Sequence, residues 1–313
     1  MDSMEAKVMK RSKAVLVACA LSLLSLVGVV RQANAQEIEV RGPLAGAPAV
    51  IGMRVYREMR FQLQLQASMT LQDEYARAIL FGGQAMFHPV DWLGIGIWGG
   101  YGAIQVDTAL TDEVTAKGQT NEVNVLSLPN ARRSPGHATE FPDQIGHIQW
   151  IAVPEVQFIP LRGKLGIFEA LFVDTDFYVL GGIGLVGLEE RADVDSGTYQ
   201  NCRNQGDTGG LGAIITCLEP TQSKRATRMA IAPVFGVGLS MYVADWGAIT
   251  MEWRALPFAW NTSGTDESGD ARGDFPDGAV DDKDRLSHFN HLFSLGFAFY
   301  LPTEPKLSHT DEN

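Results

Sequence analysis

Large apolar side chains alternate with small or polar ones over residues 60–71, and this pattern constrains the fold more than any other feature. The stretch reads RFQLQLQASMTL. Successive side chains of a β-strand point to opposite faces, whereas a helix would scatter these residues around its circumference. Residues 60–71 are therefore predicted to form a strand with one large apolar face and one face of glutamine, serine and threonine.

The same two-residue period recurs in seven further segments. They are residues 77–88, 92–104, 147–159, 172–189, 229–243, 247–258 and 288–301. In residues 147–159 the alternation places Ile148 and Trp150 on one face. Pro154 and Pro233 lie inside two of the predicted strands, and we expect a bulge or local break at each, because proline removes a ladder hydrogen bond.

The two faces of these strands differ in a way that favours lipid. The better-filled face is large and apolar, and the other is rich in glycine, alanine, serine, threonine and glutamine. The core of a β-sandwich would put the large aliphatic residues inside and charges outside. The strands have roughly ten to fifteen residues, enough to cross a bilayer, which takes about 9–11. The pattern is therefore typical of a barrel with its apolar face outward.

The connections between the predicted strands fall into two classes that alternate. Short or moderate connections at 88–91, 160–171 and 244–246 alternate with a short one near 72–74 and long polar ones at 105–146, 190–227 and 261–287. Short periplasmic turns and long outer loops are typical of bacterial outer-membrane barrels. The predicted fold is all-β: an eight-stranded antiparallel transmembrane β-barrel with long extracellular loops and short periplasmic turns.

The N-terminal residues 1–35 read as a secretory signal peptide. Lysines and an arginine precede an apolar run over residues 14–30, and Ala33-Asn34-Ala35 then gives a small-x-small cleavage site before Gln36. Cleavage is predicted between Ala35 and Gln36. A membrane anchor stays open as the alternative, although a run of about 17 residues is at the short limit for spanning a bilayer.

A signal peptide together with the barrel pattern predicts that the chain lies in the outer membrane of a Gram-negative bacterium, in contact with its lipid. The predicted divisions are a signal peptide at 1–35, a periplasmic lead-in at 36–59, the barrel at 60–301 and a C-terminal tail at 302–313. Past residue 30 there is no apolar run long enough for a transmembrane helix.

The residues around the first predicted hairpin resemble the opening of a known family. Residues 54–57 (RVYR) precede 60–63 (RFQL), and 87–92 (FHPVDW) follow. They resemble the outer-membrane β-barrel domain family of myxobacteria and related deltaproteobacteria, with its basic-aromatic lead-in and its aromatic-His periplasmic turn. The resemblance implies fold and location but no agreed activity. Residues 297–300 (FAFY) resemble the terminal signal that outer-membrane assembly machinery reads, although the tail at 302–313 follows them.

Three charged residues are candidates for the inside of the barrel. Glu252 and Arg254 share the polar face of one predicted strand, and Glu155 lies on the polar face of another. An eight-stranded barrel is just wide enough to be filled by side chains, so charges inside it should pair. We expect a structural salt-bridge plug, and a lumenal site or narrow pore is the alternative.

Two outer loops carry further candidates. Cys202 and Cys217 lie in one exported loop and are predicted to form a disulfide, which would stabilise that loop by about 3 kcal/mol in the chain-entropy model. Residues 265–285 are rich in aspartate and glutamate without EF-hand spacing. We expect a solvated loop there, and calcium binding is the alternative.

The predicted function is a structural or interaction role, with the long loops presented at the cell surface, alone or in an envelope complex. The alternatives are a small porin-like pore and an outer-membrane enzyme with a loop-borne site. No enzyme, cofactor or metal site is predicted, because the sequence holds no nucleophile elbow, zinc-protease motif or phosphate loop. The expected partners are outer-membrane lipid, the assembly machinery and envelope proteins. The net charge of −12 without a basic run excludes nucleic acid.

Overall fold

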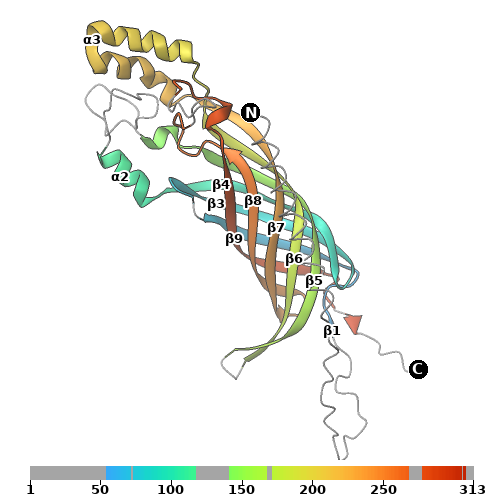
Figure 1. Ribbon diagram of the computed structural model, residues 1–313. Helices are drawn as coiled ribbons and strands as arrows, with labels where there is room; N and C mark the ends of the chain where they lie inside the picture. The colour runs from blue at the N-terminus through green and yellow to red at the C-terminus, as the bar shows by residue number, and fades with distance from the viewer. Residues whose placement is uncertain are drawn as a thin grey trace, which may run out of the picture. The chain divides into compact units, whose positions relative to one another are not determined.

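Eight antiparallel strands close into a barrel in the computed structural model, which describes residues 54–71, 73–117, 141–167, 171–267, 277–304 and 306–307. The strands of the barrel are β2 (Arg60–Leu71), β3 (Ala76–Val90), β4 (Leu93–Asp107), β5 (His147–Ile167), β6 (Leu171–Arg191), β7 (Arg225–Ala244), β8 (Gly247–Trp260) and β9 (Leu286–Leu301). Each pairs with the next, and β9 pairs with β2, so the ring has no free edge (Figure 1). All eight predicted strands are present.

Seven of the eight strands are longer than the sequence pattern predicted, and β5 exceeds its predicted range the most. β5 and β6 each have 21 residues. Residues 160–171 were expected to be a connection, but β5 continues to Ile167 and β6 begins at Leu171. The two strands stay paired from Leu161 opposite Phe177 to Ile167 opposite Leu171. This expectation was wrong because the alternation along β5 is offset at Phe158–Leu161, where the register shifts.

Neither interior proline produces a bulge, but the predicted local break is present at Pro154, because the β5–β6 pairing skips Val153 and Pro154. Pro233 pairs with Ile183 in an unbroken register, and the β5–β6 register is the same on both sides of Pro154. The shifts in β5 lie instead between Ile148 and Trp150 and between Phe158 and Leu161, beside Pro160. The first shift puts Ile148 inside and Trp150 outside, so placing both on one face was wrong.

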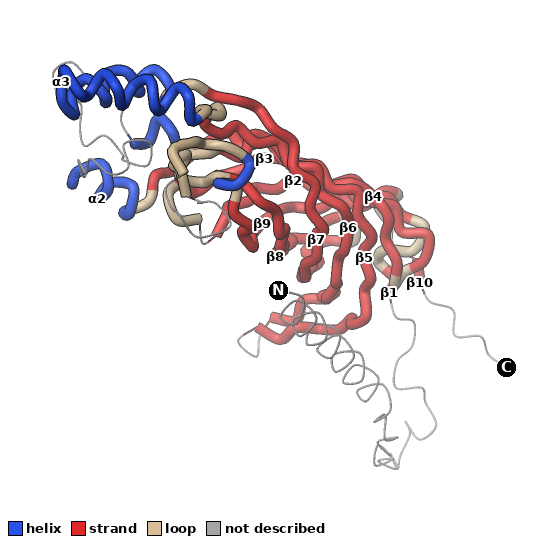
Figure 2. The backbone as a smooth tube through the Cα atoms, turned by 45° about the horizontal axis from the view of Figure 1, so that its top comes forward, coloured by secondary structure: helices blue, strands red, loops and turns tan. Residues whose placement is uncertain are grey.

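The barrel has two distinct ends, which we call the turn end and the cap end. The turn end holds the tight connections at 91–92 and 245–246. A two-stranded sheet of β1 (Arg54–Val55) and β10 (Lys306–Leu307) brings the two ends of the described chain together. Figure 2 shows this sheet at the end of the barrel opposite the helices.

The cap end carries helices that the sequence did not predict. They are α2 (Ala109–Lys117), the 3-10 helix η1 (Phe141–Gln144), α3 (Ser196–Gln222) and the 3-10 helix η2 (Asp282–Asp284). Within the described ranges, no helix combines the length and the apolar character needed to cross a membrane. The glycine-rich sequence of α3 has low intrinsic helix propensity, which explains why it read as a loop.

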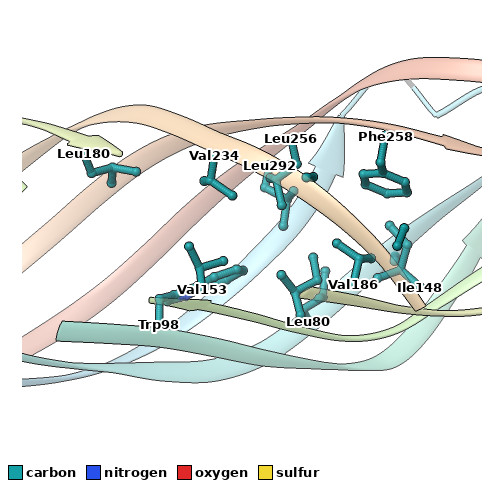
Figure 3. Packing of buried hydrophobic residues seen from close by; sticks show 14 of the residues in the cluster. Leu80, Trp98, Ile148, Val153, Leu180, Val186, Val234, Leu256, Phe258 and Leu292 are labelled. Atoms are coloured by element: carbon teal, nitrogen blue, oxygen red, sulfur yellow. The ribbon is translucent and has the colours of Figure 1, made fainter. Parts of the chain in front are cut away.

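The inside of the barrel changes character along its length. The half near the turn end is polar, with buried glutamines, Ser240 and Asp176. The half near the cap end is apolar, and Figure 3 shows Leu80, Val186 and Ile148 pointing across the interior towards Leu256 and Phe258. The sequence pattern predicted a small or polar face for the interior of the barrel, and this is right only for the half near the turn end. The prediction overlooked the apolar residues of β5, β6 and β8 that point inward near the cap end.

Candidate functional site

A single arginine from outside the barrel strands fills the inside of the turn end. Arg57 precedes β2, and its side chain is fully buried in the lumen. Its Nε donates to Asp176 Oδ2 at 2.9 Å and lies 3.1 Å from the hydroxyl of Tyr242. Its Nη2 donates to Ser240 Oγ at 2.8 Å. The lead-in therefore places the side chain of Arg57 inside the barrel, where it acts as a plug at the turn end.

The rest of the Arg57 guanidinium is also satisfied. Its Nη1 lies 3.2 Å from both Gln62 Oε1 and His88 Nε2. Because arginine can only donate, His88 Nε2 must accept, which fixes a neutral imidazole with its proton on Nδ1. The Tyr242 hydroxyl donates to the same Asp176 oxygen at 2.6 Å. This network has the dense pairing that a buried charge requires.

Arg60 fastens the chain around this plug. Its guanidinium donates to backbone carbonyls that include those of Tyr56 at 2.6 Å, Pro302 at 2.7 Å and Asp245 at 2.9 Å. These carbonyls come from the lead-in, the segment after β9 and the β7–β8 turn. One side chain thus links three segments that are distant in the sequence at the turn end.

A second charged cluster lies further inside, at the three residues that the sequence singled out. The side chains of Glu155, Glu252 and Arg254 have no exposed surface. Arg254 Nη1 lies 2.5 Å from Glu252 Oε2, and its Nη2 lies 3.3 Å from Glu155 Oε1. Its guanidinium carbon sits 4.4 Å from the ring centre of Trp98. The one cation therefore joins two carboxylates and an aromatic face.

Neutral side chains complete the coordination of the two glutamates. Tyr178 donates its hydroxyl to Glu252 Oε1 at 2.6 Å, and Gln84 donates to Glu155 Oε1. Gln64 Nε2 lies 3.4 Å from Glu252 Oε1. Buried carboxylates held by several donors behave as fixed structural groups.

A third cluster closes the cap end around Glu190. Arg228 forms a fork with this carboxylate, with its Nη2 2.9 Å from Oε1 and its Nε 3.0 Å from Oε2. Arg285 Nε lies 3.0 Å from Oε2, and the backbone N–H of Asn261 donates to Oε1 at 3.0 Å. Glu190 thereby ties β6, β7 and the connection between β8 and β9 together.

The described part of the acidic loop, residues 265–267 and 277–285, is not simply solvated, contrary to expectation, and residues 268–276 lie outside the described residues. Asp266 and Asp284 are buried and accept backbone N–H groups of their own loop. Gly278 N donates to Asp266 Oδ2 at 3.0 Å, and Glu267 N donates to Asp284 Oδ1 at 2.8 Å. Burial raises the pKa of Asp266 to about 6. Among the described residues, no group of three or more His, Cys, Asp or Glu side chains is placed to hold a metal ion.

The predicted disulfide forms and organises α3. Gly210 has a positive φ of 69° and breaks the helix into two arms. Cys202 and Cys217 lie on opposite arms with their Cα atoms 5.5 Å apart, and the disulfide joins them. Cys202 also packs with Val194, Tyr199 and Val280, and a β-bridge joins Val194 to Val280. The disulfide-linked hairpin is thus connected to the acidic loop.

Sequence reasoning found part of this site. Glu155, Glu252 and Arg254 come together as one cluster. Ala35 and Gln36 lie outside the described residues. Arg57 and Asp176 were missed. Asp176 occupies an inward position between outward-facing residues of β6, so strict alternation could have revealed it. No periodic pattern marks Arg57, because it is not in a strand of the barrel.

No protein-family model and no curated protein matches the chain. The solved structures that are similar to it include the following three. The N-terminal β-barrel domain of OprF from Pseudomonas aeruginosa has a TM-score of 0.38 at 8% identity, over 80% of this chain and 100% of that chain. Neisserial surface protein A has a TM-score of 0.33 at 8% identity, over 76% of this chain and 96% of that chain. Ail, the attachment invasion locus protein of Yersinia pestis, has a TM-score of 0.31 at 9% identity, over 78% of this chain and 99% of that chain. Values this low carry no functional inference.

Proposed function

We propose that the chain is an integral outer-membrane barrel that acts as a closed scaffold. The helices and connections of its cap end, which we call the cap, are presented at the cell surface. The observation that carries this proposal is that the outside of the ring is apolar while the inside is filled. Outward residues of the strands are extensively exposed, including Leu65 at 69%, Ile231 at 66% and Ile183 at 60%. A soluble monomer rarely exposes such a continuous apolar surface, whereas a barrel in lipid requires one.

Aromatic pairs at the turn end support a membrane boundary there. Trp92 packs edge-on against Phe158 at 5.9 Å, and Trp246 stacks on Phe299 at 5.8 Å. Tryptophan favours the interface between hydrocarbon and headgroups, because its ring is apolar and its N–H is polar. We therefore propose that the turn end lies in the periplasm and the cap end outside.

The filled lumen favours a scaffold over a pore. Three layers occupy it: the Arg57 plug, the Arg254 cluster and the apolar cluster around Leu80 and Phe258. Ion conduction would require at least the two charged layers to rearrange, and each is held by several hydrogen bonds. We infer an interaction role for the cap, whose α3 hairpin leaves Asn204, Thr208 and Gly210 exposed.

Two experiments test this proposal on the full chain. A thiol reagent that cannot cross membranes should label Thr208→Cys in intact cells, whereas Lys164→Cys near the turn end should be labelled only after permeabilisation. The reverse pattern, or labelling of neither site in any preparation, contradicts the topology. In planar bilayers the refolded barrel should show no steady unitary openings, and regular openings would favour the porin-like pore.

The proposal extends to partners and activity. The partners are outer-membrane lipid, the assembly machinery, which would read the end of β9, and an envelope protein that binds the cap. We propose that the chain has no catalytic activity and belongs with the deltaproteobacterial barrel proteins that its lead-in resembles. Capture of a surface or envelope protein by the wild-type chain, lost on deletion of 198–220, would support the interaction role. Hydrolytic activity lost with a single loop carboxylate would favour an enzyme.

A further inference from the structure

The paired strands β5 and β6 extend well beyond the rest of the barrel at the turn end. β4 pairs with β5 only as far as Leu93 opposite Phe158, and β7 pairs with β6 only as far as Met241 opposite Thr175. Beyond these points the two strands pair with each other alone, to Ile167 opposite Leu171. We call residues 161–167 with 171–177 the ribbon. Because Thr175, Asp176 and Phe177 still pair with β7, the part that projects beyond both neighbouring strands is 164–167 with 171–174, which spans roughly 13 Å at about 3.3 Å per residue.

The two faces of the ribbon differ in chemistry. The rungs Leu161–Phe177, Leu165–Val173 and Ile167–Leu171 are apolar, and one rung between them pairs Gly163 with Thr175. Of the alternate rungs, Arg162–Asp176 and Lys164–Asp174 pair opposite charges, and the outermost one pairs Gly166 with Phe172. Leu161 is 64% exposed, and the Lys164 side chain is 73% exposed. The ribbon is therefore amphipathic with a period of two.

Each face of the ribbon continues one face of the barrel wall. Leu161 and Phe177 continue the outside, which also carries Phe158 and Val179. Asp176 continues the inside, where it binds Arg57. Tyr56 donates to Asp174 Oδ2 at 2.9 Å, and Arg162 forms an ion pair with Asp91. The charged face is thus tied to the lead-in and the β3–β4 turn, while the apolar face continues the lipid-facing surface.

The direction of the ribbon brings its apolar face towards the bilayer. Figures 1 and 2 both show the ribbon leaving the barrel wall and turning away from β1 and β10. When a ribbon bends outward from a barrel, the face that continues the outer wall turns towards the membrane, and the other face turns towards water. An isolated two-stranded ribbon is marginally stable in water, so a surface that covers its apolar face would stabilise it.

We propose that the ribbon is a membrane-contact arm that lies on the periplasmic leaflet, with its apolar rungs in the interface and its Lys164–Asp174 rung in water. The occupant of the apolar face is lipid, because that face is continuous with the apolar outer surface of the barrel, which we propose is in contact with lipid. This inference rests on the proposed function, since it requires the barrel to be in a bilayer. It adds a contact with the membrane outside the spanning wall.

Position-specific quenching tests the proposal. In a Cys19→Ser background, the full chain would carry a fluorophore at Leu161→Cys, Val173→Cys, Lys164→Cys or Leu65→Cys in phosphatidylethanolamine–phosphatidylglycerol vesicles. Brominated lipid should quench labels at 161 and 173 to an extent comparable with 65, and label 164 several-fold less. Aqueous iodide should give the opposite order.

The other outcomes separate the failure of this proposal from that of the proposed function. If iodide quenches 161 and 173 as strongly as 164 while lipid quenches 65, the barrel is in the bilayer and the arm is not on it. If lipid does not quench 65, the proposed function itself fails. If 161 and 173 are shielded from both quenchers, a protein covers the ribbon and the lipid contact is wrong.

A matched pair of charge substitutions distinguishes the two faces. Leu161→Glu places a carboxylate on the apolar face, and Lys164→Glu places the same group on the charged face three residues away. Lipid quenching of a label at 173 should fall several-fold in Leu161→Glu and stay unchanged in Lys164→Glu, with 65 unchanged in both. An equal loss in both variants, or in neither, overturns the proposal.

Discussion

Arg57 and Asp176 are 119 residues apart in the sequence, yet Arg57 Nε and Asp176 Oδ2 lie 2.9 Å apart inside the barrel. Arg57 comes from the lead-in and Asp176 from β6. Both side chains are almost fully buried. The ion pair therefore fixes the lead-in to strand β6 in the wall of the barrel.

Replacing Arg57 by alanine should destabilise the barrel strongly, because Asp176 would be left buried without its cation. Loss of one partner of a buried ion pair costs about 3–5 kcal/mol. Urea unfolding of the refolded chain measures this cost. Arg57→Ala/Asp176→Ala should cost less than the sum of the single changes, and strict additivity would contradict the coupling. Lys164→Ala is the control, because its ion pair is exposed and contributes about 0–1 kcal/mol.

The Arg254 cluster should respond differently to breaking and to replacement. Arg254→Ala leaves Glu155 and Glu252 buried together without their cation and should cost about 3–5 kcal/mol. Changing Arg254 to methionine together with Glu155 and Glu252 to leucine removes every charge of the cluster and should cost less than Arg254→Ala, even though Tyr178 and Gln84 lose their acceptors. Both variants are compared by urea unfolding. A triple variant as unstable as Arg254→Ala would show that the charges themselves hold the barrel.

Gly238 provides the space that Tyr178 occupies beside Glu252. A Cβ at Gly238 would collide with the Tyr178 ring. Gly238→Ala should therefore displace the tyrosine and cost about 1–3 kcal/mol, as overpacking does. Gly163→Ala is the matched control, because a Cβ there meets nothing within 4 Å. Equal unfolding free energies for the two variants would contradict this packing.

Removing the disulfide should weaken the α3 hairpin and leave the barrel intact. Cys202→Ser/Cys217→Ser frees a loop of 15 residues, which corresponds to about 3 kcal/mol in the chain-entropy model. Amide exchange in α3 should become faster, while exchange in β7 and β8 should not change. Faster exchange throughout the strands would mean that the cap and the barrel unfold as one unit.

The cap should become more stable as the pH falls from about 7 towards 4. Burial raises the pKa of Asp266 to about 6, above its ordinary value of 3.8, so the folded cap binds this proton more tightly than the unfolded chain does. Limited proteolysis of the acidic loop should therefore slow between pH 7 and pH 5, relative to a reference peptide. Asp266→Asn should remove most of this dependence, and an unchanged dependence would assign it to another group.

The sequence predicted the strands of the barrel better than the segments that connect them. β2 has the bounds that alternation assigned to it, and β8 extends only two residues further, because one face of each strand is outward and apolar and the other is buried in the packed lumen. Arg57 could not be found in the same way, since a loop residue entering the lumen leaves no periodic mark. Helix α3 was missed because a disulfide and tertiary packing, not helix propensity, stabilise its glycine-rich arms.

The pairing of β1 with β10 joins Val55 to Lys306 as neighbours in one small sheet. The two ends of the segment 54–307 therefore lie next to each other in space. A short linker between these two strands, with a new start cut at the exposed Gly210, would give a circular permutant that keeps every barrel hydrogen bond. In such a molecule both new ends would emerge on the far side of the barrel, where a fused reporter would stand beside the cap.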